Sequence, residues 1–171
     1  PLLFDGIKEN NFLIIGRAGM DLYPDPPGAA TEDAISMSVG LGGSSANIAA
    51  GICKLGGKSA LVTRVSDDSI GLYCVNQLKK YGVDVSYVKP VGGEFRNSLA
   101  VYESRVEKHQ SVIYRNGAAD FQMDTDDVRV INYSKYGALI TAGTVFAAEP
   151  SRSASMLAFS HAKSAGLPII F

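Results

Sequence analysis

Short apolar runs alternate along this chain with stretches in which apolar residues recur at helical spacing. The runs carry few charges, which is typical of strands buried on both faces of a parallel sheet. They cover residues 12–15, 59–65, 85–88, 138–143 and 167–171. The helical stretches cover residues 44–55, 69–81 and 150–165. This alternation predicts an α/β fold with a parallel core sheet.

A second kind of strand alternates apolar and polar residues. Residues 34–39, 97–103 and 110–115 follow this pattern, which is typical of strands with one buried face. A polar turn separates the last two, so we expect a hairpin. We expect this hairpin to pair with 34–39 in a small sheet apart from the main one. The proline-rich segment 23–28 is predicted to be a loop.

A glycine-rich segment leads directly into the first helical stretch. The turn is predicted to involve Gly40, Gly42 and Gly43. Ser44 or Ser45 is then expected to cap the helix, and the amide of Asn47 to reach a ligand at the mouth of the loop. On local physics alone, a strand-to-helix connection of any α/β protein is an equally good interpretation. The dinucleotide fingerprint fails here because Ser45 stands in the place of its third glycine, and the phosphate-binding P-loop fails because its leading glycine is out of register.

Acidic residues stand at three places where a ligand or a metal could bind. Asp21 follows the run 12–15, and ligands of open α/β sheets lie beyond the carboxyl ends of strands. It would accept hydrogen bonds from a hydroxylated ligand, or it is a turn aspartate. Asp67 and Asp68 precede a helix and are interpreted as caps rather than catalytic groups. The acidic run 124–127 has metal-like spacing, but an acidic first helical turn explains it better.

Composition narrows the classes of function. The chain has 171 residues, of which 46% are hydrophobic, enough for one domain with a sizeable core. Its net charge is -1, from 16 basic and 17 acidic residues, and no basic tract is present, so a nucleic-acid partner is not expected. No apolar run approaches the ~20 residues of a membrane span, so no membrane partner is expected. We also expect no signal peptide.

The two cysteines indicate the compartment. Cys53 and Cys74 fall at apolar helical positions and are predicted to be core thiols in a reducing compartment, without a disulfide or metal pair. A cytoplasmic location is therefore expected. Residues 1–11 are predicted to be loosely ordered. The last predicted core strand, 167–171, ends the sequence, so we expect residues 1–171 to be the first part of a larger α/β domain.

The spaced glycine and aspartate motifs resemble those of a known family. The segment Gly42-Gly43-Ser44-Ser45-Ala46-Asn47-Ile48-Ala49 is followed by Leu55-Gly56 and by Val65-Ser66-Asp67-Asp68-Ser69-Ile70-Gly71. In this spacing the chain resembles the PfkB (ribokinase-like) family of carbohydrate kinases. It departs from the family at Ser45, where proline, glycine or alanine is usual, and at Ser66, where glycine is usual.

Further segments resemble one branch of that family. They are residues 114–120, with the sequence Tyr-Arg-Asn-Gly-Ala-Ala-Asp, and residues 142–144 followed by 150–152. The branch is that of 5-dehydro-2-deoxygluconokinase, the sugar-acid kinase of myo-inositol breakdown. The 2-keto-3-deoxygluconate kinases and fructokinases are close to it.

The resemblance implies a fold and an activity. The fold is a ribokinase-like three-layer α/β/α core, here its N-terminal half, with a small β-sheet lid whose strands lie at about 33–40 and 95–116. The activity is ATP-dependent phosphorylation of a primary hydroxyl of a sugar or sugar acid, with Mg²⁺ and, in some members, a monovalent cation. The partner is therefore a small sugar or sugar acid.

The resemblance also implies the residues that bind the sugar. Asp21 matches the aspartate that bonds sugar hydroxyls, and Gly42, Gly43 and Asn47 match the loop that holds the sugar. Arg115 matches the lid arginine that faces acidic sugars, where a guanidinium fork suits a carboxylate. By its position alone, Arg115 is a solvated arginine at a strand end. Asn97 and Tyr102 lie on the lid strands and are further candidates for ligand contact.

The second family signature, Asp-Thr-x-Gly-Ala-Gly-Asp, does not occur in the sequence. In the family it supplies the anion hole, the catalytic aspartate and part of the nucleotide site. We therefore expect that this chain contains no catalytic, ATP-binding or metal-binding residue, carries the sugar-binding half, and does not catalyse alone.

Two other functions remain open. One is a kinase for a neutral sugar or a nucleoside, for which Arg115 would not be needed. The other is a non-catalytic sugar-binding or assembly module whose lid strands pair between subunits. Exposed strand edges favour such pairing, which would give a homodimer through the lid.

Overall fold

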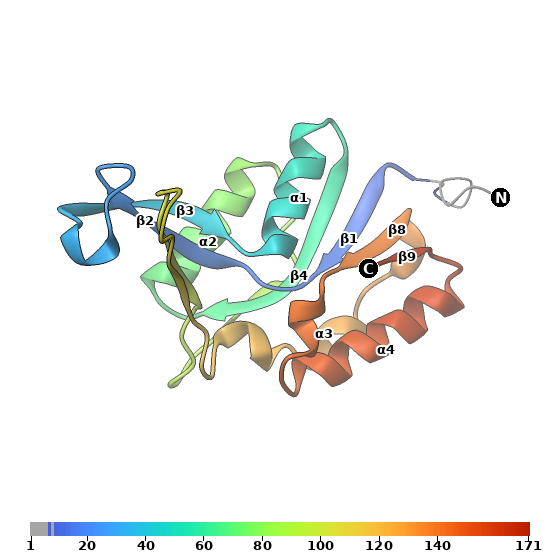
Figure 1. Ribbon diagram of the computed structural model, residues 1–171. Helices are drawn as coiled ribbons and strands as arrows, with labels where there is room; N and C mark the ends of the chain where they lie inside the picture. Colours follow the sequence, from blue (N-terminus) through green and yellow to red (C-terminus); the bar gives the residue numbers. More distant parts are fainter. Residues whose placement is uncertain (1–6, 8) are drawn as a thin grey trace.

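The structure, a computed structural model, describes residues 7 and 9–171 and contains two sheets (Figure 1). The core sheet is entirely parallel, with the strand order β5-β4-β1-β8-β9. Its strands are β1 (Asn11–Ile15), β4 (Lys58–Ser66), β5 (Val88–Val91), β8 (Ala138–Thr141) and β9 (Ile169–Ile170). The expected loose order of residues 1–11 lies outside the described residues for 1–6 and 8, and it was wrong for Asn11, which begins β1.

Helices cover both faces of the core sheet, which explains why β1 is apolar from Phe12 to Ile15 (Figure 1). Leu13 and Ile15 belong to one buried cluster, with side chains of α4 (Ser151–Ser164) and Val128 of α3 (Thr125–Arg129). Ile14 points the other way, into a cluster with α1 (Ser44–Lys54) and α2 (Ser69–Lys80). Successive residues of a strand face opposite sides of the sheet, so both faces of β1 carry apolar side chains. The predicted three-layer core is confirmed.

The second sheet is the lid, with the strand order β3-β2-β6-β7. Its strands are β2 (Gly19–Asp25), β3 (Ser36–Gly42), β6 (Leu99–Tyr102) and β7 (Ser111–Tyr114). The hairpin of β6 and β7 is confirmed. The sequence predicted that it would pair with β3, and this prediction was wrong. Instead β2 lies between them, antiparallel to β3 and parallel to β6.

The prediction of a loop over residues 23–28 was wrong for its first part, which completes β2. Proline argued against a strand because it has no N–H to donate. In the structure β6 pairs only with Met20, Asp21 and Leu22. Beyond Leu22 the strand has a single neighbour, β3, so Pro24 removes no hydrogen bond from a second one.

The third core strand was also misplaced. The sequence predicted residues 85–88, whereas β5 begins at Val88 and runs to Val91. It is an edge strand of the core sheet and includes Pro90. An edge tolerates proline, whose missing donor would weaken a central strand.

Helix ends show which capping predictions were right. Asp68 caps α2 by accepting hydrogen bonds from the N–H groups of Ile70 and Gly71. In α1 the N-cap is Gly43, and no side chain caps the helix. Ser45 instead donates its hydroxyl to the carbonyl of Ile15, at 3.1 Å. This bond ties the start of α1 to the carboxyl end of β1.

Short helical turns complete the connections. They are η2 (Thr31–Asp33), η3 (Ala119–Gln122), η4 (Tyr133–Lys135) and η5 (Gly143–Phe146). On α4, Ala162 is buried, whereas Met156 is 57% exposed. None of the helices formed by the described residues has the length and apolar character needed to cross a membrane.

Candidate functional site

The glycine segment forms a corner between β3 and α1 in which side chains have no room. Gly43 has φ 100, the left-handed region that glycine favours, and a Cβ there would collide with the carbonyl oxygen of Arg17. A Cβ on Gly42 would collide with the carboxyl group of Asp21. Gly40 and Gly42 lie in β3 without positive φ, so only Gly43 supplies the special turn geometry.

The sequence suggested that Asp21 lies in a loop beyond β1. In the structure it lies in β2. It is 6% exposed, and its Oδ1 is buried without a hydrogen-bond partner among the described residues. Burial raises the pKa of this carboxyl, while the positive charge of Arg17 and the Tyr23 hydroxyl act in the opposite direction. A buried carboxylate oxygen without a donor requires an explanation, and a bound ligand that donates hydrogen bonds supplies one.

Strand register places an aromatic pair beside Asp21. Side chains two residues apart share one face of a strand, so Tyr23 lies on the face of Asp21. Tyr102 lies on this face too, because Ala100, two residues earlier in β6, is paired with Asp21. The rings of Tyr23 and Tyr102 are stacked, with centroids 6.3 Å apart. Tyr102 is one of the ligand-contact residues predicted from the sequence, which stays a prediction; Tyr23 was not among them because its segment was interpreted as a loop.

Asn47 lies on α1, one turn from the glycine corner. It is exposed, and its side-chain amide makes no hydrogen bond to the described part of the chain. The amide is therefore available to a ligand, as the sequence prediction requires.

Asn97 has a structural role that the sequence did not indicate. It is 8% exposed. Its Oδ1 accepts from the N–H of Ser66 at 2.8 Å, and its Nδ2 donates to the carbonyl of Ala18 at 3.1 Å and to the Cys74 sulfur at 3.2 Å. These bonds join the entry to β6 with the end of β4 and the entry to β2. Protein groups therefore occupy both ends of its amide, although Asn97 also lines a cavity of about 520 Å³.

Arg115 follows β7 and reaches the carboxyl end of β8. Its Nε donates to Asp120 Oδ2 at 3.2 Å, and Nη2 also bonds to this oxygen. Nη2 donates in addition to the carbonyl of Thr144 at 3.0 Å, in η5. The interpretation of a solvated arginine is therefore wrong, since the side chain is 16% exposed and paired. The Nε–Nη2 edge of the fork is occupied by Asp120.

The glycine corner and Arg115 both lie near the carboxyl ends of β1 and β8. Position 16, just after β1, is close to Ser45 of α1 and to Val145 of η5. Arg115 bonds to Thr144, the residue before Val145. The glycine corner, Asp21 and Arg115 therefore border the same edge of the core sheet, where ligands bind in α/β proteins.

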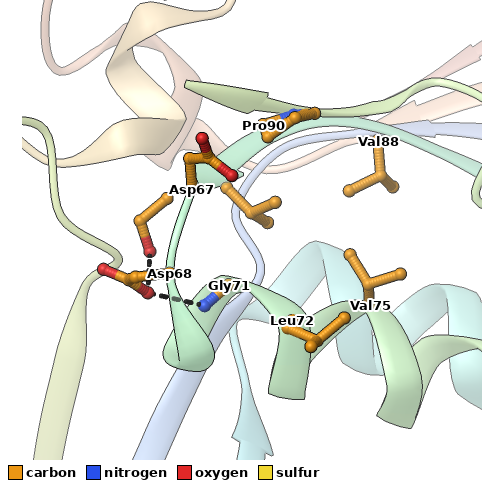
Figure 2. Close-up of a pocket in the computed structure, with 9 residues that line it drawn as sticks. Asp67, Asp68, Gly71, Leu72, Val75, Val88 and Pro90 are labelled. Atoms are coloured by element: carbon orange, nitrogen blue, oxygen red, sulfur yellow. Dashed lines mark hydrogen bonds between the residues drawn. The ribbon is translucent and has the colours of Figure 1, made fainter. Parts of the chain in front are cut away.

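A separate cavity of about 440 Å³ lies between the end of β4, α2 and β5 (Figure 2). Val65, Leu72, Val75, Val88 and Pro90 form its apolar wall, with Asp67 and Asp68 at one end. The Asp68 carboxylate is turned toward the N–H of Gly71, as a cap (Figure 2). None of the predicted site residues lines this cavity.

The acidic run before α3 is structural too. Asp124 caps α3, and Asp127 forms an ion pair with Arg64. Within residues 7 and 9–171, no group of three or more His, Cys, Asp or Glu side chains is arranged to hold a metal ion.

Comparison with known proteins gives a consistent family. Residues 9–171 match the model of the pfkB family of carbohydrate kinases. Among curated proteins, 5-dehydro-2-deoxygluconokinase from Clostridium perfringens is 36% identical over 174 residues, covering 98% of this chain and 50% of that protein. The chain thus spans about half the length of the curated relatives it matches.

Solved structures show the same fold. An uncharacterised sugar kinase from Pyrococcus horikoshii, in complex with ATP, superposes with a TM-score of 0.81 at 24% identity, covering 92% of this chain and 51% of that one. A protein from Enterococcus faecalis that has been assigned as a 2-keto-3-deoxygluconate kinase gives a TM-score of 0.83 at 15% identity, over 93% of this chain and 47% of that one.

Proposed function

Because this chain belongs to the pfkB family of carbohydrate kinases, we propose that its protein phosphorylates a primary hydroxyl of a sugar acid with ATP, and that these 171 residues bind the sugar. One observation carries the proposal. Asp21 is a buried carboxylate with an oxygen lacking a donor, and it faces a glycine corner where any side chain would collide. Sugar hydroxyls supply the donors that this oxygen lacks.

The residues of this chain would orient the sugar rather than react with it. Asp21 would accept hydrogen bonds from two hydroxyls, and the bare backbone of Gly42 and Gly43 would let the sugar approach the main chain. Asn47 would offer both a donor and an acceptor. Fixing the sugar in this way presents its primary hydroxyl in one orientation, which lowers the entropic part of the barrier to reaction.

A sugar acid is favoured over a neutral sugar by Arg115. Its guanidinium lies at the same edge of the core sheet, and a partly buried arginine suits a carboxylate. The first curated relatives that match over nearly the whole chain are named 5-dehydro-2-deoxygluconokinase. We therefore propose 5-dehydro-2-deoxygluconate, or a keto-deoxy sugar acid of similar shape, as the acceptor.

The phosphoryl donor would be held elsewhere. ATP supplies the transferred phosphoryl group and Mg²⁺ neutralises its charge, but the described residues hold no group of three or more metal-ligating side chains, and the second family signature does not occur in the sequence. We propose that those functions, and any monovalent-cation requirement, depend on residues outside these 171. The prediction that the chain alone does not catalyse stays a prediction.

A kinase assay at the protein's natural length tests the proposal. We expect the highest kcat/KM with 5-dehydro-2-deoxygluconate or 2-keto-3-deoxygluconate, and a much lower value with fructose. Arg115→Met should raise KM for the acid about tenfold, the scale of losing a charged hydrogen bond, and leave fructose unchanged. Turnover by the isolated 171 residues would refute the proposal that phosphoryl transfer depends on residues outside them.

A neutral-sugar kinase is the second candidate. The observation that favours it is the ion pair of Arg115 with Asp120, which already offsets the arginine charge. Equal kcat/KM for fructose and for both acids would establish it.

A further inference from the structure

Two buried aspartates in the described part of the chain, Asp127 and Asp120, each pair with an arginine, and the two pairs are built differently. In the first, Asp127 is 2% exposed and uses both carboxylate oxygens. Arg64 donates from Nε to Oδ2 at 2.7 Å and from Nη2 to Oδ1 at 2.9 Å. Lys89 Nζ lies 3.0 Å from Oδ1, and the N–H of Asp124 donates to Oδ2 at 3.1 Å. Such saturation is what stability requires of a buried ion pair.

The second pair, Arg115 with Asp120, is not saturated. Asp120 is 7% exposed, and both bonds from Arg115 go to Oδ2. Its Oδ1 is buried and has no hydrogen-bond partner in the described part of the chain. An unpartnered carboxylate oxygen lowers stability. A pair arranged for stability alone would use both oxygens, as the Asp127 pair does.

The contacts of Arg115 leave one nitrogen unused. Asp120 holds the Nε–Nη2 edge, and the Thr144 carbonyl takes another hydrogen from Nη2. The guanidinium carbon lies 4.2 Å from the ring centroid of Phe121, which covers one face. Among the described residues, Nη1 has no hydrogen-bond partner, so its two N–H groups are the donors that remain for a ligand.

We propose that Asp120 is a positioning residue for substrate. It holds the guanidinium of Arg115 by one edge so that Nη1 is presented to the carboxylate of the sugar acid. This inference rests on the proposed function, since it assumes an acidic substrate at Arg115. It also corrects the simpler expectation of a two-pronged fork: the carboxylate meets one nitrogen of Arg115, because the Nε–Nη2 edge is taken.

Asp120 has two effects on an acid, and they have opposite signs. As an anchor it lowers the conformational freedom that Arg115 loses on binding substrate, which favours the acid. As a negative charge beside the arginine it weakens the attraction for a second carboxylate. Two variants separate these effects: Asp120→Ala removes anchor and charge together, whereas Asp120→Asn removes the charge and keeps an acceptor oxygen.

The experiment is done with the protein at its natural length. It measures KM for whichever of 5-dehydro-2-deoxygluconate and 2-keto-3-deoxygluconate is turned over faster, and KM for the uncharged amide of the same acid. The ratio of KM for the acid to KM for the amide does not depend on how much of a variant is folded. We expect Asp120→Ala to raise KM for the acid about tenfold, the scale of one hydrogen bond to a charged group, with the amide unchanged. Asp120→Asn should restore the wild-type ratio or lower it.

Asp127→Asn is the matched control, because it alters an equally buried carboxylate that also pairs with an arginine. It should lower the melting temperature and leave the KM ratio unchanged. A wild-type ratio in Asp120→Ala would overturn the positioning role, and a lower ratio would show that Asp120 competes with substrate for Arg115. A wild-type enzyme that treats acid and amide alike would instead overturn the proposed function, and the inference with it.

Discussion

At the scale of single residues, Asp21 is placed where its charge is costly. Its carboxyl is buried, one oxygen lacks a donor, and burial raises its pKa. Proteins keep such groups where a ligand compensates for them, and stability is lower as a result. The two roles of Asp21 can be separated, because one changes with pH in the free protein and the other needs sugar.

The first prediction concerns Asp21→Asn. Since the pKa of Asp21 is higher in the folded than in the unfolded chain, its contribution to stability is fully present below the unfolded pKa and lost as pH rises through the folded pKa. The amide should therefore raise the free energy of unfolding at pH 7 by about 1 kcal/mol, and should abolish sugar binding.

Urea unfolding from pH 4 to pH 8 measures this effect, and calorimetry measures sugar binding. Asp33→Asn, at an exposed position, is the control for loss of one negative charge. A less stable Asp21→Asn protein at pH 7 would contradict the argument that the buried charge of Asp21 lowers stability.

The second prediction concerns the glycine corner. Gly42→Ala places a methyl group against the Asp21 carboxyl, so Asp21 or β3 must move. We expect a loss of about 1–3 kcal/mol in the free energy of unfolding, as for an overpacked core, and a KM for sugar raised at least tenfold.

Gly51→Ala is the matched control within α1. A Cβ there meets nothing within 4 Å, and alanine stabilises a helix by roughly 0.5–1 kcal/mol relative to glycine. Denaturant titration and kinase assays on both variants make the comparison. Equal KM values would show that the corner does not shape the sugar site.

At the scale of elements, the lid is joined to the core by hydrogen bonds as well as by the chain. Asn97 bonds at once to Ser66, at the end of β4, and to Ala18, before β2. It therefore sets where two lid strands leave the core sheet. Its sequence position on a lid strand suggested ligand contact instead, since nothing local shows which distant backbone groups an amide will meet.

The third prediction separates these roles. Asn97→Ala leaves the buried N–H of Ser66 and the carbonyl of Ala18 without partners, so the free energy of unfolding should fall by about 2–3 kcal/mol. Asn132→Ala, which removes the exposed cap of η4, should cost about 1 kcal/mol or less. Urea unfolding curves give both values. A stable Asn97→Ala protein with a much higher KM would favour ligand contact.

Core elements were easier to predict than lid elements, for a physical reason. A core strand such as β1 is covered by helices on both faces, so its continuous apolar run states its environment directly. Strand β2 has a mixed pattern that includes Pro24, because beyond Leu22 it has a single neighbouring strand. Where a proline is tolerated depends on the neighbours, and these are set by the tertiary fold.

At the scale of the whole molecule, the lid presents an apolar row on the face opposite Asp21. Val39, Leu22, Val101 and Val112 follow one another across the four strands by register. Val39 is 53% exposed and Val112 44%, at the two edge strands of the lid. Apolar side chains on edge strands favour association.

The fourth prediction is that the protein forms a homodimer through the lid. Val39→Glu places a charge in the row and should convert a concentration-dependent dimer to a monomer, as measured by sedimentation equilibrium. Leu55→Glu is the control, because Leu55 is 90% exposed but lies at the end of α1, outside the lid. A wild-type protein that is monomeric at all concentrations would refute the dimer.

The sequence alone determined the fold class and the family, and it predicted the stretch at which a sugar would bind. Those features depend on local patterns: apolar runs, a glycine pair before a helix, and an aspartate cap such as Asp68. The tertiary structure decided what distant partners do. It placed Asp21 on a lid strand against Gly42, gave Asn97 its structural bonds, and fixed Arg115 by Asp120 and Thr144. A side chain's burial and hydrogen bonds depend on which segments pack together, and spacing along the chain does not specify that.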